Sequence, residues 1–430
     1  MIDIKNASIS RICENAHQNT TKTDSYCKKE EPLSTIRYDT LYFNSLVPAT
    51  AIMNENSMTI LFVLQFIGQP RFSKRMSMLS AEGFQVEAIA FERSTHRGRL
   101  PTAPVKTLGN ISHGQFLKRV PTLLKSLPVL RKEIRNHDVV YCMGPDMSLL
   151  VTLASIGLKT IKIVEVGDIN PIQTRKGVIG KVARIADRWQ INTSALLVVT
   201  APDFLRIYYR EWLNSTIPGL VIENKVEQSA LTKARNNQTS YQSTDNSNTP
   251  ITIGYFGLLR CKWSWSVLIQ LMKDNPDTHR LVLAGVALNI ENFEEIVNTN
   301  SNIVYKGKYK SPEDLPELYD SVDIVWACYP PNLQTNWNHN WARPNRFYEA
   351  CLYRKPLITR DGSNDSVVIK ERNIGFSLDI SDCQEAAVTV SKIGKDQISN
   401  WQTNMTLLPE DLYTYTTEAE VLAQFITDID

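Results

Sequence analysis

Short apolar segments alternate with longer amphipathic segments through most of the sequence, and this alternation restricts the possible folds more than any other feature. In the first half, strands are predicted at residues 58–66, 85–91, 138–143, 160–166 and 195–200. Helices are predicted between them, at residues 71–82, 116–135, 145–156 and 177–191. Strands that alternate with helices at this spacing form crossover units, so the sheet is parallel and helices cover both of its faces. The first half is therefore expected to be a doubly wound α/β domain.

A polar segment rich in Asn, Gln, Ser and Thr, residues 227–249, interrupts this pattern and indicates a linker. Strands are predicted again at residues 251–256, 280–284, 302–305, 324–328 and 356–359. The helices of this half are predicted at residues 264–273, 292–297, 315–321, 346–353 and 366–371. Doubly wound sheets bind ligands at the carboxyl ends of their strands. We therefore predict two Rossmann-like doubly wound parallel-sheet domains, residues 58–226 and 250–405, that face each other across a cleft.

Two segments lie outside these domains. Residues 1–57 are rich in Asn, Thr, Ser, Lys and Glu without sustained periodicity, which indicates a low-complexity N-terminal extension. In residues 406–430, the apolar positions between 418 and 426 have helical spacing. We expect a C-terminal helix there that packs back on the domains.

Composition excludes several classes of protein. Apolar residues make up 43% of the chain, so most of it can bury a core and a largely disordered protein is excluded. The 7 cysteines are scattered and never spaced as Cys-x-x-Cys, so neither a disulfide framework nor a zinc site is predicted. Since no apolar run reaches 18 residues and no secretory signal opens the chain, a cytoplasmic protein is expected.

Charge is distributed unevenly along the chain. Residues 58–226 carry 23 Lys and Arg against 12 Asp and Glu, whereas residues 227–430 carry 18 against 26. Much of the excess lies in the predicted helices at residues 116–135 and 177–191. Such helices can lie on an anionic membrane surface, or they can pack on the sheet with solvated cations, and the sequence does not separate these alternatives. We expect a cytoplasmic protein that, on the first alternative, contacts an anionic membrane surface peripherally at the inner face of the cell membrane, and we expect no nucleic-acid partner.

A glycine-containing segment after the first strand of the second half has the composition of a phosphate site. Gly257 is predicted to form a turn that exposes backbone amides to a phosphate. Arg260 and Lys262 follow it and could neutralise a departing diphosphate. The structural alternative is a tight turn with two solvated cations.

A second candidate lies at residues 343–349, where a proline-led loop opens a predicted helix. Free amides at the start of a helix attract phosphate, so the amides of Asn345, Arg346 and Phe347 are candidates for the donor site. Arg343 and the side chain of Arg346 add positive charge, and Glu349 lies one turn further on, where its carboxylate could accept hydrogen bonds from ribose hydroxyls. A surface helix with an ordinary exposed glutamate is the structural alternative.

Taken in order, these segments resemble the GT-B glycosyltransferases, especially glycosyltransferase family 4. The resemblance covers about residues 58–426 and rests on the Gly257 segment, on Leu281–Gly285, on Val304–Tyr309, on Leu315–Ile324 and on the Glu349 helix with Lys355 and Pro356. It implies that the backbone around Lys308 and Tyr309 holds the nucleotide base, that Glu349 holds the ribose, and that Gly68 faces the donor phosphates. The family's helix motif has two glutamates: the second corresponds to Glu349, but the first, which contacts the donor sugar, is Trp341 in this chain. The sugar and the stereochemical outcome of the reaction therefore stay open.

The acceptor side is expected in the first half, where Asp146 and Asp168 each follow a predicted strand. A carboxylate at a cleft-facing strand end can take a proton from an acceptor hydroxyl, as an inverting transfer requires. Either residue could instead cap a helix or a turn, because Pro145 and Pro171 lie beside them.

The function that these observations predict is a metal-independent transfer of a sugar from a nucleotide-sugar donor to a hydroxyl of a saccharide in surface polysaccharide biosynthesis, and a lipid-linked saccharide is the expected acceptor. No cofactor is predicted, since the nucleotide sugar is a substrate. The chain lacks the glycine fingerprints of dehydrogenases and phosphate-loop NTPases, and its one Asp-x-Asp is at residues 428–430. The alternatives are a non-catalytic GT-B-like binding subunit, favoured by Trp341, and a nucleotide-sugar epimerase of the same fold.

Overall fold

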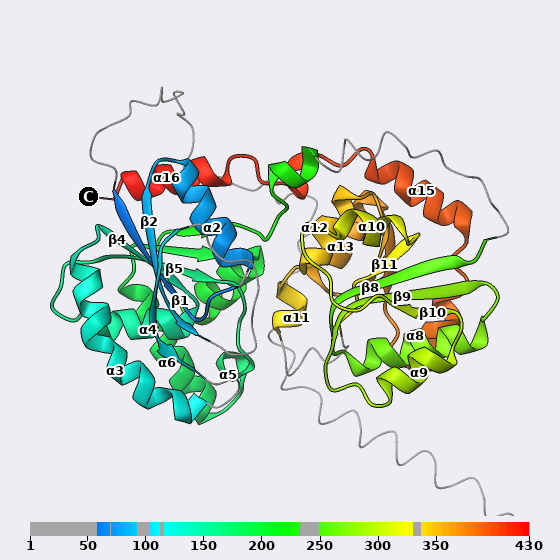
Figure 1. Cartoon of the computed structure of the whole chain (residues 1–430), viewed down its shortest axis with the longest axis horizontal. Coiled ribbons are helices and arrows are strands. Elements are labelled where there is room, and N and C mark those ends of the chain that lie inside the picture. The colour runs from blue at the N-terminus through cyan, green and yellow to red at the C-terminus, as the bar shows by residue number, and fades with distance from the viewer. Residues whose placement is uncertain are drawn as a thin grey trace, which may run out of the picture. The chain divides into compact units, whose positions relative to one another are not determined.

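Two parallel β-sheets, one in each half of the chain, organise the protein (Figure 1). This computed structural model describes residues 58–68, 70–92, 103–111, 116–232, 249–329 and 337–429. The predicted N-terminal extension and most of the predicted linker lie outside the described residues. Residues Asn56–Asp430 form one compact unit, so contacts between the two halves are internal to it.

The first sheet has seven strands in the order β3-β2-β1-β4-β5-β6-β7. The strands are β1 (Thr59–Leu64), β2 (Gln85–Glu92), β3 (Val105–Asn110), β4 (Val139–Met143), β5 (Ile161–Val166), β6 (Leu196–Val199) and β7 (Gly219–Val221). Every neighbouring pair is parallel. The chain order reverses direction between β1 and β4, which is where such sheets form a crevice for ligands.

Helices cover both faces of this sheet, because side chains of successive strand residues point to opposite faces. Leu61 and Val63 of β1 pack on one face, with α3 (Phe116–Arg135), α4 (Pro145–Ala154), α6 (Val178–Asn192) and the π-helix η2 (Phe204–Trp212). Ile60 and Phe62 pack on the other face, with α2 (Pro70–Ala81) and the C-terminal helix α16 (Glu418–Thr427). A short helix, α5 (Pro171–Thr174), follows β5.

The second sheet has six strands in the order β10-β9-β8-β11-β12-β13, again all parallel. The strands are β8 (Ile251–Leu259), β9 (His279–Ala287), β10 (Ile303–Tyr305), β11 (Ile324–Trp326), β12 (Leu357–Arg360) and β13 (Gly375–Leu378). Its helices are α8 (Lys262–Asp274), α9 (Phe293–Thr299), α10 (Leu315–Asp320), α11 (Asn338–Trp341), α12 (Asn345–Leu352), α13 (Asn364–Arg372), α14 (Cys383–Val390) and α15 (Lys395–Met405), and a 3-10 turn η3 (Glu410–Leu412) precedes α16. The predicted fold class, two Rossmann-like doubly wound sheets, is confirmed.

The predicted turn at Gly257 is wrong, because β8 continues through this residue to Leu259. Gly257 pairs with Gly285 of β9, and both have positive φ, 100° and 122°. A Cβ at position 285 would lie 1.9 Å from the Gly257 carbonyl oxygen, so Gly285 permits the close approach of the two strands. The glycine therefore serves strand packing, and the loop begins at Arg260.

The C-terminal helix returns to the first half. Leu422 and Ile426 of α16 are fully buried in the core that α2 covers, and Lys225 forms an ion pair of 2.6 Å with Glu418. None of the helices in the described ranges is long and apolar enough to cross a membrane.

Candidate functional site

A cavity of about 1840 Å³ receives residues from both halves of the chain. Gln65, Gly144 and Gly167, which follow β1, β4 and β5, line it from the first half. Leu258 of β8 and Cys328, two residues after β11, line it from the second. The carboxyl ends of both sheets therefore open into one cavity, as the sequence predicted.

Glu349 of α12 lies at the second-half end of this cavity. It is only 8% exposed, and one carboxylate oxygen accepts a hydrogen bond of 2.8 Å from the Tyr319 hydroxyl. Burial raises the pKa of Glu349, although the bond from Tyr319 and the positive charges of Lys74 and Arg346 act in the opposite direction. The residue is thus a fixed hydrogen-bond acceptor that can receive bonds from a ligand's hydroxyl groups.

Arg346, one turn before Glu349, brings a half-buried positive charge to the same end. Its guanidinium lies 5.1 Å from the centre of the Tyr255 ring and donates a 3.1 Å hydrogen bond to the Trp326 carbonyl. Burial acts to lower the pKa of Arg346, but the surrounding tyrosines, Tyr255 first among them, outweigh it and raise the pKa. The charge is therefore retained in a partly enclosed, aromatic environment, where it attracts an anion more strongly than it would in bulk water. Asn345 and Pro344, at the start of α12, line the cavity beside it.

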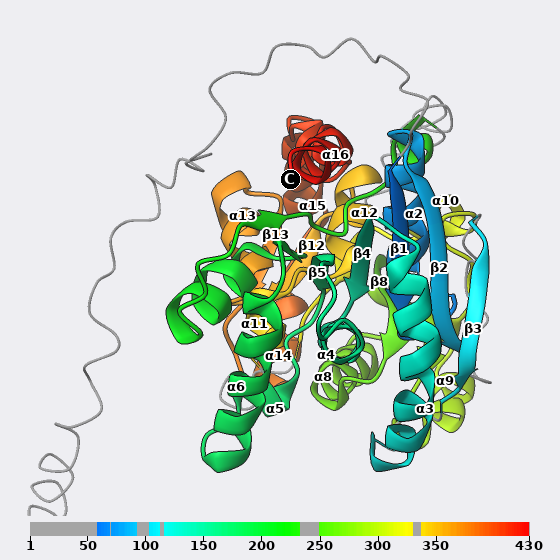
Figure 2. The same cartoon turned by 90° about the vertical axis from the view of Figure 1, so that its left-hand side faces the viewer.

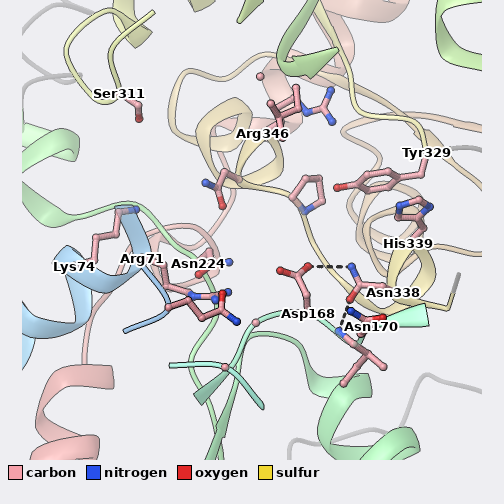
Figure 3. Close-up of a pocket in the computed structure, with 18 of the residues that line it drawn as sticks. Arg71, Lys74, Asp168, Asn170, Asn224, Ser311, Tyr329, Asn338, His339 and Arg346 are labelled. Carbon is pink, nitrogen blue, oxygen red and sulfur yellow. Dashed lines mark hydrogen bonds between the residues drawn. The ribbon is translucent and has the colours of Figure 1, made fainter. Parts of the chain in front are cut away.

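A stacked pair of aromatic rings, Tyr329 and His339, forms another wall (Figure 3). The ring centres are 4.8 Å apart and the planes are inclined by 8°. Burial, and to a lesser extent Arg260, lowers the pKa of His339, so its imidazole is neutral near pH 7. A flat wall of this kind can pack against a sugar or a base, and Arg260, which is exposed, lines the cavity close to it.

Asp168 lies at the first-half end, directly after β5, and Asn338 of the second half holds it in place. The Asn338 amide donates a 3.0 Å hydrogen bond to the Asp168 carboxylate. The amide oxygen of Asn338 accepts a 2.8 Å bond from the Ile169 backbone N–H (Figure 3). Asp168 itself is exposed to the cavity, so its carboxylate has a defined orientation and access to a bound molecule.

Asp146, the other predicted carboxylate, also lines the cavity but is more deeply enclosed. Its carboxylate accepts hydrogen bonds from the Gln65 side chain and from the Met147 backbone N–H. Burial raises the pKa of Asp146. Since Asp146 lies in the first turn of α4, it also contributes to the start of that helix.

Arg71 and Lys74 of α2 enter the cavity from the first half, and sequence reasoning missed them. The Arg71 guanidinium lies along Gly167, where a Cβ would be only 1.3 Å from one of its nitrogens. Glu165, which is fully buried, anchors Arg71 at 3.7 Å and Arg75 at 2.8 Å. The sequence did carry one signal for Arg71 and Lys74: both lie in the helix that directly follows the first strand, and that helix begins at the ligand-binding edge of such a sheet.

Several predicted donor-site residues lie elsewhere in the described part of the chain. Lys262 is exposed and pairs with Glu291 at 3.0 Å, away from the cavity. Arg343 bonds to Glu223 at 3.0 Å and to Asp365 at 3.2 Å, so it joins the two halves. Three further predicted residues are not among those that line the cavity: Gly68, Lys308 and Phe347.

Gly257, Arg260, Tyr309, Asn345, Arg346 and Glu349 are the predicted donor-site residues that do line the cavity, together with both predicted aspartates. Trp341, which stands where the family has a glutamate, is 3% exposed and points into the first-half core. Its ring packs 5.5 Å from Trp212 and 5.5 Å from Trp337. The substitution thus replaces a polar group with part of an aromatic cluster between the halves.

Comparison with solved structures identifies the class of fold. HepE of Anabaena in complex with UDP matches with a TM-score of 0.60 and 15% identity, over 86% of this chain and 100% of HepE. WaaG, a glycosyltransferase involved in lipopolysaccharide biosynthesis, matches with a TM-score of 0.62 and 14% identity, over 86% of this chain and 100% of WaaG. The protein has the GT-B glycosyltransferase fold, as the resemblance in its sequence predicted.

One curated protein is similar to this chain in sequence. The succinoglycan biosynthesis protein ExoL of Rhizobium meliloti is 26% identical to this chain over 346 residues, which are 78% of this chain and 84% of ExoL. No protein-family model matches the sequence.

Proposed function

We propose that this protein is a glycosyltransferase that moves a sugar from a nucleotide-sugar donor to a hydroxyl group of a saccharide acceptor during polysaccharide biosynthesis. The observation that carries the proposal is that Arg346 and Glu349 of the second half and Asp168 of the first half line the same cavity. The fold supports it, and so do the solved complexes of HepE with UDP and with UDP-glucose. The name of ExoL supports the polysaccharide context.

The donor occupies the second-half end. Its diphosphate lies near Arg346, Arg260 and the backbone amides of Asn345 and Arg346 at the start of α12, because helix N-termini and guanidinium groups both stabilise phosphate. The Phe347 amide is already bonded to the Pro344 carbonyl. Glu349 accepts hydrogen bonds from the ribose hydroxyls, and the segment from Tyr309 to Pro312 borders the base. Two arginines and the amides supply the positive charge that a metal ion supplies in other transferases, so the reaction is expected to proceed without a divalent cation.

In an inverting transfer, the acceptor oxygen attacks the anomeric carbon as the bond from that carbon to the diphosphate oxygen breaks. Asp168 takes the proton that the acceptor hydroxyl loses, and Arg346 and Arg260 stabilise the charge that develops on the departing diphosphate. In a retaining transfer, the departing phosphate oxygen takes that proton instead. Asp168 is the base in our proposal, and Asp146 is the second candidate.

The acceptor enters from the first half, where Arg71, Lys74 and Asp146 line the cavity. An acceptor that carries a phosphate-linked lipid fits the positive charge of this half, and such an acceptor would bring the protein to the cytoplasmic face of a membrane. The lipid-linked acceptor and the peripheral location are parts of this proposal.

Nucleotide binding tests the donor site directly. Thermal unfolding is measured with UDP, GDP, ADP, CMP and dTDP for the wild type and for Glu349→Gln and Arg260→Ala. A ligand at 100 times its Kd stabilises the native state by about 2.7 kcal/mol, so one nucleotide should raise the Tm clearly and less so in both variants. Lys262→Ala is the matched control, since this exposed cation lies outside the cavity and its loss should leave the shift intact. A wild type that responds to none of the five nucleotides would contradict the proposal.

A non-catalytic binding subunit is the second candidate, favoured by the burial of Trp341 at the position of the family's sugar-binding glutamate. Release of free nucleotide only in the presence of an acceptor separates a transferase from this alternative and from an epimerase. Binding of a nucleotide without any such release, across a panel of acceptors, would favour the subunit.

A further inference from the structure

Helix α6 leaves a row of large apolar side chains in solvent. Val178, Val182, Ile185 and Trp189 are 79%, 60%, 59% and 44% exposed. Their spacings of four, three and four residues place them on one narrow stripe of the helix. Ile179, beside the stripe, is 53% exposed. Such a contiguous apolar face on a folded protein indicates a surface that is covered in the functional state.

The charges around the stripe all have one sign. Arg175, Lys176, Lys181 and Arg188 are exposed along or just before α6. The acidic residue of this helix, Asp187, lies on the opposite side, where it is buried and accepts hydrogen bonds from Gln173, Gln190 and Tyr208. A stripe of apolar groups flanked by cations has the composition of helices that lie at the interface of an anionic bilayer.

The same helix also borders the cavity. Ala183, Ala186, Asp187 and Gln190 line it from α6, and Ile172 and Gln173 line it from the preceding α5. The apolar stripe and the cavity therefore lie on different sides of one helix. Figure 2 shows α6 and α3 both reaching the lower margin of the first half, and α3 leaves Leu124 55% exposed.

We propose that the α6 stripe binds the surface of an anionic lipid bilayer, with Val178, Val182, Ile185 and Trp189 inserted among the headgroups and Lys181 and Arg188 paired with lipid phosphates. The inference deepens the proposed function, because a lipid-linked acceptor held in that bilayer is then adjacent to the cavity. The membrane contact itself is independent of catalysis and can be tested without it.

Charge decides for a bilayer over a second copy of the chain. A two-fold interface across this stripe would bring the same patch of both copies together, and with it two sets of exposed cations. An anionic surface neutralises those cations and accepts the apolar side chains as well. Association of two copies is therefore the less favourable way to cover the stripe.

Vesicle flotation with the full-length protein tests the proposal. The vesicles consist of phosphatidylcholine alone or of an equal mixture of phosphatidylcholine and phosphatidylglycerol. We expect binding to the anionic vesicles, reduced about tenfold or more by Val182→Glu with Ile185→Glu, because two apolar anchors become charges. Lys181→Glu with Arg188→Glu should reduce it by at least about fivefold per cation replaced. The matched control is Val388→Glu with Leu407→Glu, which alters two exposed apolar residues of the second half, 43% and 78% exposed, and should bind as the wild type does.

Quenching of Trp189 tests directly which face of α6 meets the bilayer. Lipids that carry a quencher in the headgroup region should reduce tryptophan fluorescence of the wild type. Replacement of Trp189 by Phe should remove most of this quenching while vesicle binding stays within about threefold, since one large apolar ring is retained. Quenching that persists in the Trp189→Phe variant would overturn the proposed orientation.

The results separate failure of the membrane surface from failure of the proposed function. Each variant is also tested for its nucleotide-induced Tm shift, which should match that of the wild type because α6 lies at the acceptor side. No binding of the wild type to anionic vesicles, or equal binding by the stripe variants, would overturn the membrane proposal and leave the transferase proposal standing. A wild type that sediments as a dimer, and becomes monomeric on Val182→Glu with Ile185→Glu, would assign the stripe to a second copy instead.

Discussion

The carboxylates of Glu349 and Asp168 face the same cavity from opposite halves, but the protein holds them in different ways. Glu349 is 8% exposed, lies in the interior of a helix and is bonded to Tyr319 of its own half. Asp168 is exposed in a loop, and Asn338, whose side chain donates a hydrogen bond to it, comes from the other half. The donor end is therefore complete within one sheet and its helices, whereas the acceptor end depends on contact between the halves.

This difference has a functional consequence. A binding group that is fixed within one half can capture the nucleotide in any arrangement of the two halves. A proton acceptor that is oriented across the cavity is correctly aimed only when the segment containing Asn338 is docked, which the aromatic packing of Trp337 and Trp341 against Trp212 supports. We therefore expect changes near Glu349 to affect donor binding and changes near Asp168 to affect turnover.

Asp168→Asn should have the largest effect. The amide keeps the acceptor oxygen that faces Asn338, but it can no longer take a proton, and loss of a general base costs about 100- to 10,000-fold in kcat. Nucleotide release in the presence of acceptor measures kcat, and the Tm shift by the nucleotide should be unchanged. Asp146→Asn is the matched control and should reduce kcat by less than about tenfold. If the two variants exchange these effects, Asp146 is the base; if neither matters, the transfer retains configuration.

Glu349→Gln should affect binding more than chemistry. Hydrogen bonds to a charged acceptor contribute about 1.5 to 3 kcal/mol, so the Kd of the nucleotide should rise by roughly 10- to 100-fold while kcat changes little. Because burial raises the pKa of Glu349, the folded state favours its protonated form, and its contribution to stability falls as pH rises above the ordinary carboxyl range. The Gln variant should therefore be at least as stable as the wild type at neutral pH. A variant that unfolds more easily there, with nucleotide affinity intact, would reverse the assignment of this residue to the donor.

Local periodicity decides which parts of the molecule the sequence could predict. The strands and helices around the cavity have strong local periodicity, so most of them were predicted within a few residues. β7 has three residues and η2 is a π-helix, and neither has a pattern that local periodicity detects. Glu349 was found because its helix carries a motif within one continuous segment.

Contacts between distant segments could not be predicted in the same way. Asn338 lies 170 residues from Asp168, and nothing in either segment indicates the other. The role of Arg343 was predicted from its charge, but Glu223 and Asp365, which surround it, are 120 and 22 residues away. Gly257 was predicted as a turn because its pairing with Gly285 becomes visible only in the sheet.

Asn338→Leu should remove the contact across the cavity and leave both carboxylates in place. We expect kcat to fall by about tenfold or less, the equivalent of roughly one hydrogen bond, while the KM for the donor stays constant. Combined with Asp168→Asn, it should cause little further loss, since both changes act on the same proton transfer. Asn340→Leu, in the same helix but outside the cavity lining, is the control. A full additional tenfold loss in the double variant would mean that Asn338 acts on something other than Asp168.

Asp365→Asn should have the smallest effect on turnover, within about twofold, and should act on the junction between the halves. Asp365 of the second half and Glu223 of the first share the guanidinium of Arg343, so two carboxylates are buried with one cation. Burial raises the pKa of Asp365 to about 7, with a contribution from Glu223, although Arg343 opposes the shift.

The sign of the pH dependence follows from this pKa. The folded protein keeps a proton on Asp365 at pH values where the unfolded chain releases it, so stability should fall as pH rises from the ordinary carboxyl range to about 7 and level off above it. Between about pH 5 and about pH 8, the decrease in Tm should be smaller in Asp365→Asn than in the wild type by at least about 2 °C. Asp361→Asn provides a control of opposite sign: burial acts to raise the pKa of Asp361, but hydrogen bonds from Lys370 and Ser377 lower it. Asp361→Asn should therefore reduce stability mainly at pH values above the carboxyl range. If the Tm of the wild type instead rises toward pH 8, and Asp365→Asn removes that rise, both Asp365 and Glu223 stay ionised in the folded protein.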